Sequence, residues 1–176
     1  MNANSQAALS YDNMNDAHTL FVRSPSGRYK PATDDQVLAA GRVAAESLIS
    51  TDDVMGRPGY VARFFQSKLA GLGHECAAFL YLDSQLKPIR YLEQAMGTLS
   101  QASIYPREIV KTALRLNAAA LMMAHNHPSG IAEPSAADIN LTRQLKQALA
   151  LIDVRLLDHI VVSGTGTTSL AERGQV

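Results

Sequence analysis

The chain has 176 residues, of which 47% are hydrophobic and 18% charged, an ordinary composition for a globular protein with a single core. Its 16 basic and 16 acidic residues balance, so no overall positive field recruits nucleic acid, although a local patch would suffice. The single cysteine, Cys76, excludes an intramolecular disulfide and a zinc site built from several thiolates. No apolar run approaches membrane-spanning length, and the polar N-terminus lacks the build of a signal peptide, so we expect a cytoplasmic protein with no membrane partner.

The first part of the chain does not have the pattern of a packed domain. Residues 1–33 are rich in Asn, Ser, Asp and Pro, and the stretch SPSGRYKP is typical of turns, so we expect a flexible N-terminal arm. From Asp34 the apolar residues recur at helical spacing until TDDVMGRPG interrupts the pattern. Residues 34–56 are therefore predicted to form an N-terminal helix and a linker.

The remaining residues, 57–176, have the pattern of one α/β domain. Pro58 suits the first turn of a helix that Gly71 ends. The apolar run ECAAFLYLD predicts a buried strand, and LKPIRYLEQAMGT predicts a second one, antiparallel to the first because the link is short. YPREIVKTALRLN predicts a helix and AAALMMAH a third buried strand. A helix from Ser135 to about Leu151, a strand VRLLDHIVVSG and a short edge strand TTSL complete the pattern.

Three basic residues follow one face of the predicted helix YPREIVKTALRLN. Arg107, Lys111 and Arg115 are spaced by one helical turn each. A track of phosphate contacts would need such a stripe, but a helix face exposed to solvent has the same pattern, and we favour the solvated face. The stripe keeps a DNA-associated protein as one alternative function.

The third predicted strand ends in AHNHPSG, residues 124–130. Because side chains alternate along a strand, His125 and His127 share a face, while Asn126 points the other way and is expected to have a structural role. Pro128 cannot donate a ladder hydrogen bond, so the strand is predicted to end there. Both imidazoles then project from the open end of a buried strand, where α/β proteins build their sites. A histidine pair at a strand end can equally be a packing feature.

Beyond a polar loop, Ser135 and Asp138 form a Ser-x-x-Asp pattern before an apolar helical run. This pattern is a signature of a helix start, with Ser135 as the N-cap. If the helix starts beside the end of the strand, two imidazoles and one carboxylate converge, and three such ligands leave one tetrahedral position for water, as in catalytic zinc sites. Both residues could serve only to cap the helix, but together with the histidine pair they favour metal binding.

The motifs of other metal-dependent enzymes do not fit these residues. The HNH nuclease motif takes its name from residues spread over some tens of positions, so three adjacent residues are no evidence for it. A zinc deaminase needs a Pro-Cys-x-x-Cys segment, which a chain with one cysteine cannot supply. The helical His-Glu-x-x-His motif of another class of zinc protease is also absent.

His-x-His-Pro followed by Ser-x-x-Asp resembles the signature of the JAMM (MPN+) metalloproteases. The resemblance covers roughly residues 57–174 and is specifically to the RadC family, through YPRE (105–108), ALRLNAAALMMAHNHPSG (113–130), PSAADINLTRQLKQA (134–148) and LLDHIVVSG (156–164). It implies a three-layer α/β/α sandwich with a mixed sheet, of the cytidine-deaminase-like (JAB/MPN) type, over the predicted domain. It also implies a Zn²⁺ ion held by His125, His127 and Asp138.

The resemblance further implies a glutamate just before the first strand of the domain, which is the place of Glu75. Zinc lowers the pKa of a bound water to about 7, and a carboxylate there can take the proton. The residues alone do not separate Glu75 from Glu93, near the end of the second strand; the resemblance favours Glu75 and keeps Glu93 in reserve. It also gives Ser135 a second role, stabilising the oxyanion of the reaction. Asp158 and His159 lie outside the ligand pattern and are expected to support it or to pack.

By this resemblance the chain is a zinc-dependent hydrolase, a metallopeptidase or isopeptidase that acts on an unknown protein or peptide. Longer RadC proteins carry a helix-hairpin-helix segment suggestive of DNA binding, and residues 1–56 are too short for it and lack its Gly-rich hairpin. The alternatives are a DNA-repair-associated DNA-binding protein and a catalytically silent MPN-like interaction module. A complete set of metal ligands argues against the silent module.

Overall fold

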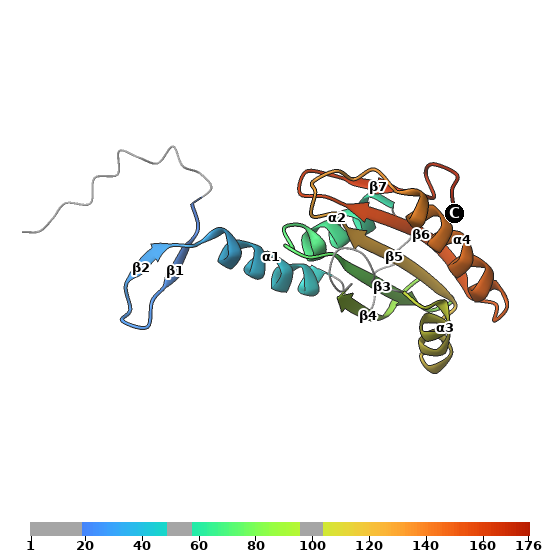
Figure 1. Cartoon of the computed structure of the whole chain (residues 1–176). Coiled ribbons are helices and arrows are strands. Elements are labelled where there is room, and N and C mark those ends of the chain that lie inside the picture. Colours follow the sequence, from blue (N-terminus) through green and yellow to red (C-terminus); the bar gives the residue numbers. More distant parts are fainter. Residues whose placement is uncertain (1–18, 49–57, 96–103) are drawn as a thin grey trace, which may run out of the picture. The chain divides into compact units, whose positions relative to one another are not determined.

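The computed structural model describes residues 19–48, 58–95 and 104–176, so the predicted linker and the end of the second predicted strand lie outside the described residues (Figure 1). The helices are α1 (Asp34–Leu48), α2 (Pro58–Leu69), α3 (Pro106–Arg115) and α4 (Ala136–Ala150). The strands are β1 (Phe21–Arg23), β2 (Tyr29–Pro31), β3 (Cys76–Leu82), β4 (Pro88–Ala95), β5 (Ala120–Asn126), β6 (Arg155–Val162) and β7 (Thr167–Ser169). Within the described ranges, no helix is both long enough and apolar enough to cross a membrane.

The chain divides into two compact units at Ala40, and the first contains a short hairpin. Its strands β1 and β2 pair antiparallel, and the turn between them is closed by a hydrogen bond from the Ser24 N–H to the Arg28 carbonyl at 2.7 Å. Gly27 in this turn has φ +82°, which glycine adopts without steric cost. The sequence predicted the turn but not the strands, because three largely exposed residues show no apolar periodicity. The flexibility of residues 1–33 and the domain boundaries stay predictions.

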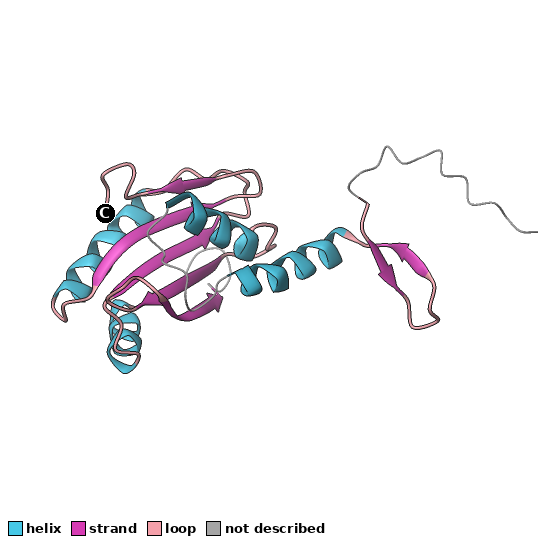
Figure 2. Ribbon diagram, turned by 180° about the vertical axis from the view of Figure 1, so that it is seen from behind, coloured by secondary structure: helices cyan, strands magenta, loops and turns pink. Residues whose placement is uncertain are grey.

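The second unit is built on a five-stranded sheet with the strand order β4-β3-β5-β6-β7 (Figure 2). β5 and β6 run parallel, and the other neighbouring strands are antiparallel, so the predicted mixed sheet is confirmed. β3 and β5 are buried along their whole length, as expected for continuous apolar runs. The predicted antiparallel β3–β4 pair and the short edge strand β7 are both present.

Helices cover both faces of this sheet and make the predicted three-layer α/β/α arrangement (Figures 1 and 2). The alternation of side chains along β3 divides the core into two parts. Ala78 and Leu80 pack under α2, together with Phe64 and Phe65. The residues that alternate with them along β3, such as Phe79, point to the opposite face and pack with the side chains of α3 and α4. Each face of the strand is therefore committed to one helical layer.

The topology brings three chain segments to one edge of the sheet. Because β5 and β6 are parallel, α4 forms the crossover between them and starts beside the end of β5. This is the carboxyl end of the two parallel strands, where open α/β sheets place ligands. β3 runs the other way, with Ala77 opposite His125, so the residues just before β3 reach the same edge. The start of β3, the end of β5 and the first turn of α4 meet there.

Candidate metal centre

The two histidines at the end of β5 point their Nε2 atoms at each other, 2.9 Å apart. The His125 side chain is 1% exposed and that of His127, just after the strand, is 18% exposed. The Nδ1 atom of His127 lies 2.9 Å from the backbone oxygen of Ile131. A carbonyl oxygen only accepts hydrogen bonds, so this Nδ1 carries the proton of the neutral ring. The Nε2 atom of His127 is then left with a lone pair that faces His125.

Asp138 joins the histidines from the first turn of α4. Its Oδ1 lies 3.2 Å from Nε2 of His125, and its Oδ2 lies 3.6 Å from Nε2 of His127. Ser135 is the N-cap: its side chain accepts a hydrogen bond from the Asp138 N–H, and its own N–H donates to Oδ2 of Asp138 at 2.7 Å. This is the predicted capping box. It turns the carboxylate back over the helix start, toward the end of β5.

The carboxyl group of Asp138 is held in its ionised form. Burial by itself raises the pKa of this group, but hydrogen bonding and charge from His125 and hydrogen bonds from Ser135 outweigh burial. The result is a pKa well below the usual value for an aspartate. The Ser135 hydroxyl contributes directly, donating to Oδ2 at 2.6 Å. An anionic carboxylate beside two imidazole nitrogens is a donor set that suits a divalent transition metal.

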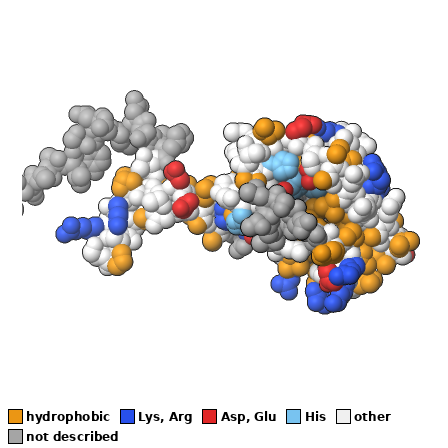
Figure 3. Space-filling model, in the orientation of Figure 1, with side chains coloured by type: hydrophobic (Ala, Val, Ile, Leu, Met, Phe, Trp, Pro, Cys, Tyr) orange, Lys and Arg blue, Asp and Glu red, His pale blue; other side chains and the backbone are white. Residues whose placement is uncertain are grey.

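Glu75 brings a second carboxylate to the same place from the start of β3. One of its oxygens, a ring nitrogen of His125 and one of His127 lie within 4.8 Å of one another, a group that could hold a metal ion. Asp138 contacts both histidines from α4. Side chains from three chain segments therefore meet: Glu75 before β3, the two histidines at the end of β5, and Asp138 on α4. Figure 3 shows a histidine and acidic side chains close together on one face of this unit.

Glu93, the reserve candidate for the base, lies on the opposite face of the sheet. It is paired with Ala78 in the β3–β4 ladder, and directly opposite residues of an antiparallel pair share a face. Ala78 belongs to the core under α2. By contrast, Ala77, which is opposite His125, belongs to the core under α3 and α4. Of the two glutamates, Glu75 is therefore the one that reaches the histidines.

Asn126, between the two histidines, fastens the segment that carries Glu75. Its Oδ1 accepts a hydrogen bond from the Cys76 N–H at 2.8 Å. Its Nδ2 donates to the His74 carbonyl at 2.9 Å and to the Leu72 carbonyl at 3.4 Å. The predicted structural role is confirmed, because the amide ties the backbone on both sides of Glu75 to the strand that carries the histidines.

Comparison with known proteins identifies the family of the chain. A family model described as the RadC-like JAB domain matches residues 55–175. The chain belongs to this family. It is 48% identical over 163 residues to a UPF0758 protein of Bordetella petrii, covering 88% of this chain and 72% of that protein. It is 51% identical over 140 residues to a UPF0758 protein of Bordetella bronchiseptica, covering 80% and 62%, and 50% identical over 148 residues to one of Methylibium petroleiphilum, covering 84% and 67%.

Behind His125, this RadC-like domain has a chain of buried polar groups. Nδ1 of His125 lies 2.8 Å from Nε2 of His159, and Nδ1 of His159 lies 2.6 Å from Oγ1 of Thr142. Burial and the neighbouring His125 lower the pKa of His159 to about 3, so its ring is neutral at pH 7. Sequence patterns did not single out Thr142, which lies with Leu145 and Leu149 on the buried side of α4. The signal that could have singled it out is a hydroxyl on an otherwise apolar helix stripe.

Asp158, the other polar residue of the family-like segment in β6, has a different task. Its Oδ2 accepts a hydrogen bond from the Ser169 hydroxyl at 2.6 Å, and its Oδ1 accepts one from the Ala171 N–H at 3.0 Å. The buried carboxylate thus fastens β7 and the segment after it to β6. The RadC-like domain uses Asp158 for packing, as one of the two expected roles.

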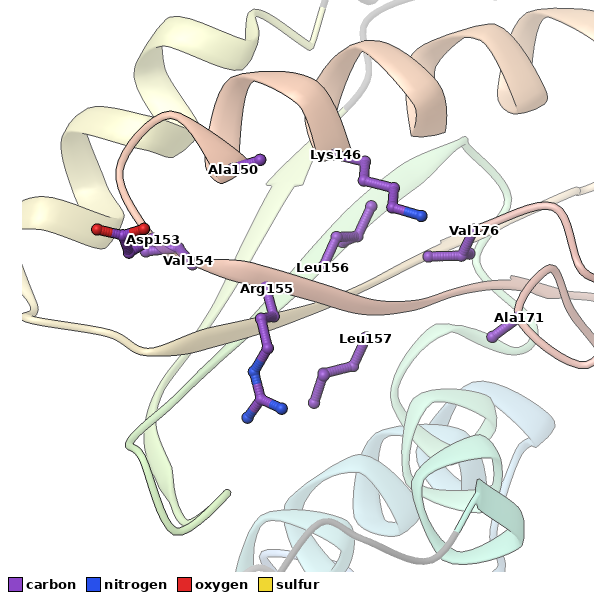
Figure 4. Close-up of a pocket in the computed structure, with 9 residues that line it drawn as sticks. All are labelled: Lys146, Ala150, Asp153, Val154, Arg155, Leu156, Leu157, Ala171 and Val176. Carbon is purple, nitrogen blue, oxygen red and sulfur yellow. The ribbon is translucent and has the colours of Figure 1, made fainter.

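Two other surfaces of the RadC-like domain bear on its possible functions and lie apart from the candidate metal centre. On α3, Glu108 forms ion pairs with two members of the basic stripe, Arg107 at 3.5 Å and Lys111 at 3.9 Å, which weakens the stripe as a phosphate track. A cavity of about 550 Å³ opens beside the start of β6 (Figure 4). Its lining includes Arg155, which pairs with the first residue of β5. The two histidines lie at the other end of β5. The cavity is therefore at the opposite end of the sheet.

Proposed function

We propose that the RadC-like domain is a zinc-dependent hydrolase that cleaves an amide or isopeptide bond of a protein or peptide. The observation that carries the proposal is the meeting of Glu75, His125, His127 and Asp138 at one edge of the sheet. Catalytic zinc sites use three nitrogen or oxygen ligands and keep one position open. His125, His127 and Asp138 would hold the ion, and Glu75 would stay beside it as the base.

The chain's own residues then divide the chemistry. When bound, zinc supplies Lewis acidity and lowers the pKa of a coordinated water. Glu75 takes the proton of the attacking water and returns it to the leaving nitrogen of the substrate. Asn126 holds the backbone on either side of Glu75, so the carboxylate is positioned by a strand rather than by a free loop.

Ser135 is the candidate for stabilising the oxyanion. Its side chain is at the exposed rim of the site, at the N-terminus of α4, where the helix dipole also favours negative charge. Its hydroxyl donates to Asp138 in the structure. A substrate carbonyl at the rim would be its alternative acceptor. Ile131, exposed in the same loop, offers an apolar contact at this rim for a polypeptide chain.

Metal content tests the first half of the proposal. The full-length protein, purified without chelators, is analysed by inductively coupled plasma mass spectrometry, and the metal-free protein is titrated with zinc against a chromogenic chelator. We expect close to one zinc ion per chain and a high affinity. A wild-type protein that contains no zinc and takes none up would overturn the proposal.

Peptide cleavage tests the second half. A proteome-derived peptide mixture is incubated with the zinc-loaded protein, and new termini are identified by mass spectrometry. Glu75→Gln should keep zinc but lose about 100- to 10,000-fold in cleavage rate, the usual range for a general base. Glu93→Gln, the same change on the other face of the sheet, should leave cleavage unchanged. Cleavage that survives in Glu75→Gln, or that is lost in both variants, would contradict the assigned base.

A further inference from the structure

The buried groups behind His125 form one continuous hydrogen-bonded chain. It runs from Nδ1 of His125 to His159 in β6, from His159 to Thr142 on α4, and from Thr142 to the backbone oxygen of Asp138, the last step at 2.6 Å. Both inner members are 0% exposed. The chain therefore links one candidate metal ligand, His125, to the helical turn that carries another, Asp138.

The direction of each hydrogen bond in this chain follows from what its members can donate. The carbonyl oxygen of Asp138 only accepts, so the single proton of the Thr142 hydroxyl points at it. The hydroxyl oxygen must then accept from its other partner, Nδ1 of His159. A neutral imidazole has one N–H, so Nε2 of His159 is left as an acceptor. Nδ1 of His125 is consequently the donor across the 2.8 Å contact.

We propose that Thr142 and His159 are positioning residues that hold His125 in the tautomer with its proton on Nδ1, which keeps the lone pair of Nε2 free for the metal. The inference rests on the proposed metal site. Metal-binding histidines commonly donate their second nitrogen to a carboxylate or a carbonyl. Here the acceptor is a second histidine, whose own proton is placed by a threonine hydroxyl.

The surroundings of His125 and His127 explain why their Nδ1 protons have different kinds of acceptor. His127 lies just after the strand, and a loop carbonyl, that of Ile131, accepts its proton. His125 lies inside the sheet between β3 and β6, where the backbone groups are used by the strand ladders. A side chain from the next strand must accept its proton instead. A neutral acceptor there adds no further negative charge to a site that already contains Asp138 and Glu75.

Removing the threonine hydroxyl should allow the ring protons of His159 and His125 to move to the other ring nitrogen. In Thr142→Val, which has nearly the same shape, Nδ1 of His159 loses its acceptor, and the proton of His159 can move to Nε2. His125 must then accept at Nδ1 and carry its own proton on Nε2, the atom proposed to bind zinc. We expect zinc affinity to fall about 10- to 100-fold, the usual effect of losing a partner of a metal ligand. Thr142→Ser keeps the hydroxyl and should bind zinc like the wild type.

The tautomers can be measured directly. Long-range ¹H–¹⁵N NMR spectra of the metal-free, ¹⁵N-labelled full chain at pH 8 distinguish imidazoles protonated at Nδ1 from those protonated at Nε2. We expect His125 and His159 of the wild type to carry a proton on Nδ1, and His125 of Thr142→Val to lose that proton and keep one on Nε2. Zinc affinity of wild type, Thr142→Val and Thr142→Ser is measured by chelator competition, with backbone amide spectra to verify folding.

The outcomes separate this inference from the proposed function. A wild-type His125 that carries no proton on Nδ1 overturns the inference even if zinc binds normally, and this measurement needs no variant. Unchanged zinc affinity and an unchanged tautomer in folded Thr142→Val overturn it as well. A wild type that binds no zinc overturns the proposed function, and with it the role of the chain toward a metal.

Discussion

At the end of β5, the polar side chains on the two faces of the strand have different kinds of partners. On the α2 face, the Asn126 amide has partners within the protein for both its oxygen and its nitrogen. On the α4 face, the Nε2 atoms of His125 and His127 and the Asp138 carboxylate are directed at one another. A satisfied buried amide stabilises backbone, whereas lone pairs brought together favour a cation between them. Residues 125–127 therefore hold neighbouring backbone in place on one face of the strand and form part of the candidate metal site on the other.

The strongest test of this difference is Asp138→Ala. The variant removes a charged donor from the α4 face, so we expect its zinc content, measured by mass spectrometry, to fall from near one ion per chain to near zero. Asn140→Ala, an exposed change on the same helix, is the matched control and should keep zinc. Full zinc occupancy in folded Asp138→Ala would mean that the carboxylate is only a helix cap.

Removing the metal should lower the stability of the protein, because the proposed ligands lie on the α4 face of β5. A ligand that binds only the folded state at about 100 times its Kd stabilises it by about 2.7 kcal/mol. A chelator should therefore lower the free energy of unfolding of the zinc-loaded wild type by about this amount, measured by urea denaturation. Asp138→Ala should show no such response. An equal response of both proteins would indicate that the chelated metal is bound elsewhere.

The α2 face is tested by Asn126→Leu. The change leaves the Cys76 N–H and the His74 carbonyl without their partner, which should lower the free energy of unfolding by about 1–3 kcal/mol. Zinc should still bind, because the histidines are on the other face. Asn126→Asp should be no milder, because it keeps the acceptor for Cys76 but buries a carboxylate against the carbonyl oxygens of His74 and Leu72. Complete loss of zinc by a folded Asn126→Leu protein would contradict the division between the faces.

Ser135→Ala should have the smallest effect on stability. Loss of an N-cap costs about 1 kcal/mol, and zinc should be retained because Ser135 is not a ligand. Ser135→Thr keeps a capping hydroxyl and should restore most of the stability, as measured by urea denaturation. A cleavage rate that falls in Ser135→Ala by much more than its stability loss explains would support the oxyanion role; an unchanged rate would restrict Ser135 to capping.

The features of the site that are local in sequence could be predicted without the structure. His125 and His127 share a face because strand side chains alternate, and Ser135 and Asp138 form a capping box because their spacing matches the first turn of a helix. The choice between Glu75 and Glu93 was not local. It depends on the register of three strands, which puts Glu93 with the core under α2.

Thr142 and His159 show where sequence patterns stop being informative. Seventeen positions separate them, and each fits a packing role in its own element. Their contact exists because α4 crosses over from β5 to β6 and packs on the strand that it precedes. The β1–β2 hairpin escaped prediction for the opposite reason, since its strands bury too little apolar surface to leave a pattern.

By itself, the sequence determined the order of helices and strands from α1 onward, the family through its motifs, and the separate patterns of a same-facing histidine pair and a capping aspartate, because each of these is local in the sequence. The resemblance already favoured Glu75, and the tertiary structure added the strand register that puts Glu75 rather than Glu93 beside the histidines. Only the tertiary structure showed how Asn126 holds that glutamate's segment and which buried groups accept the proton of His125. Those relations join residues on different strands and helices, and they depend on strand register and on the path of the crossover helix. Neither quantity is encoded in the period of any single segment.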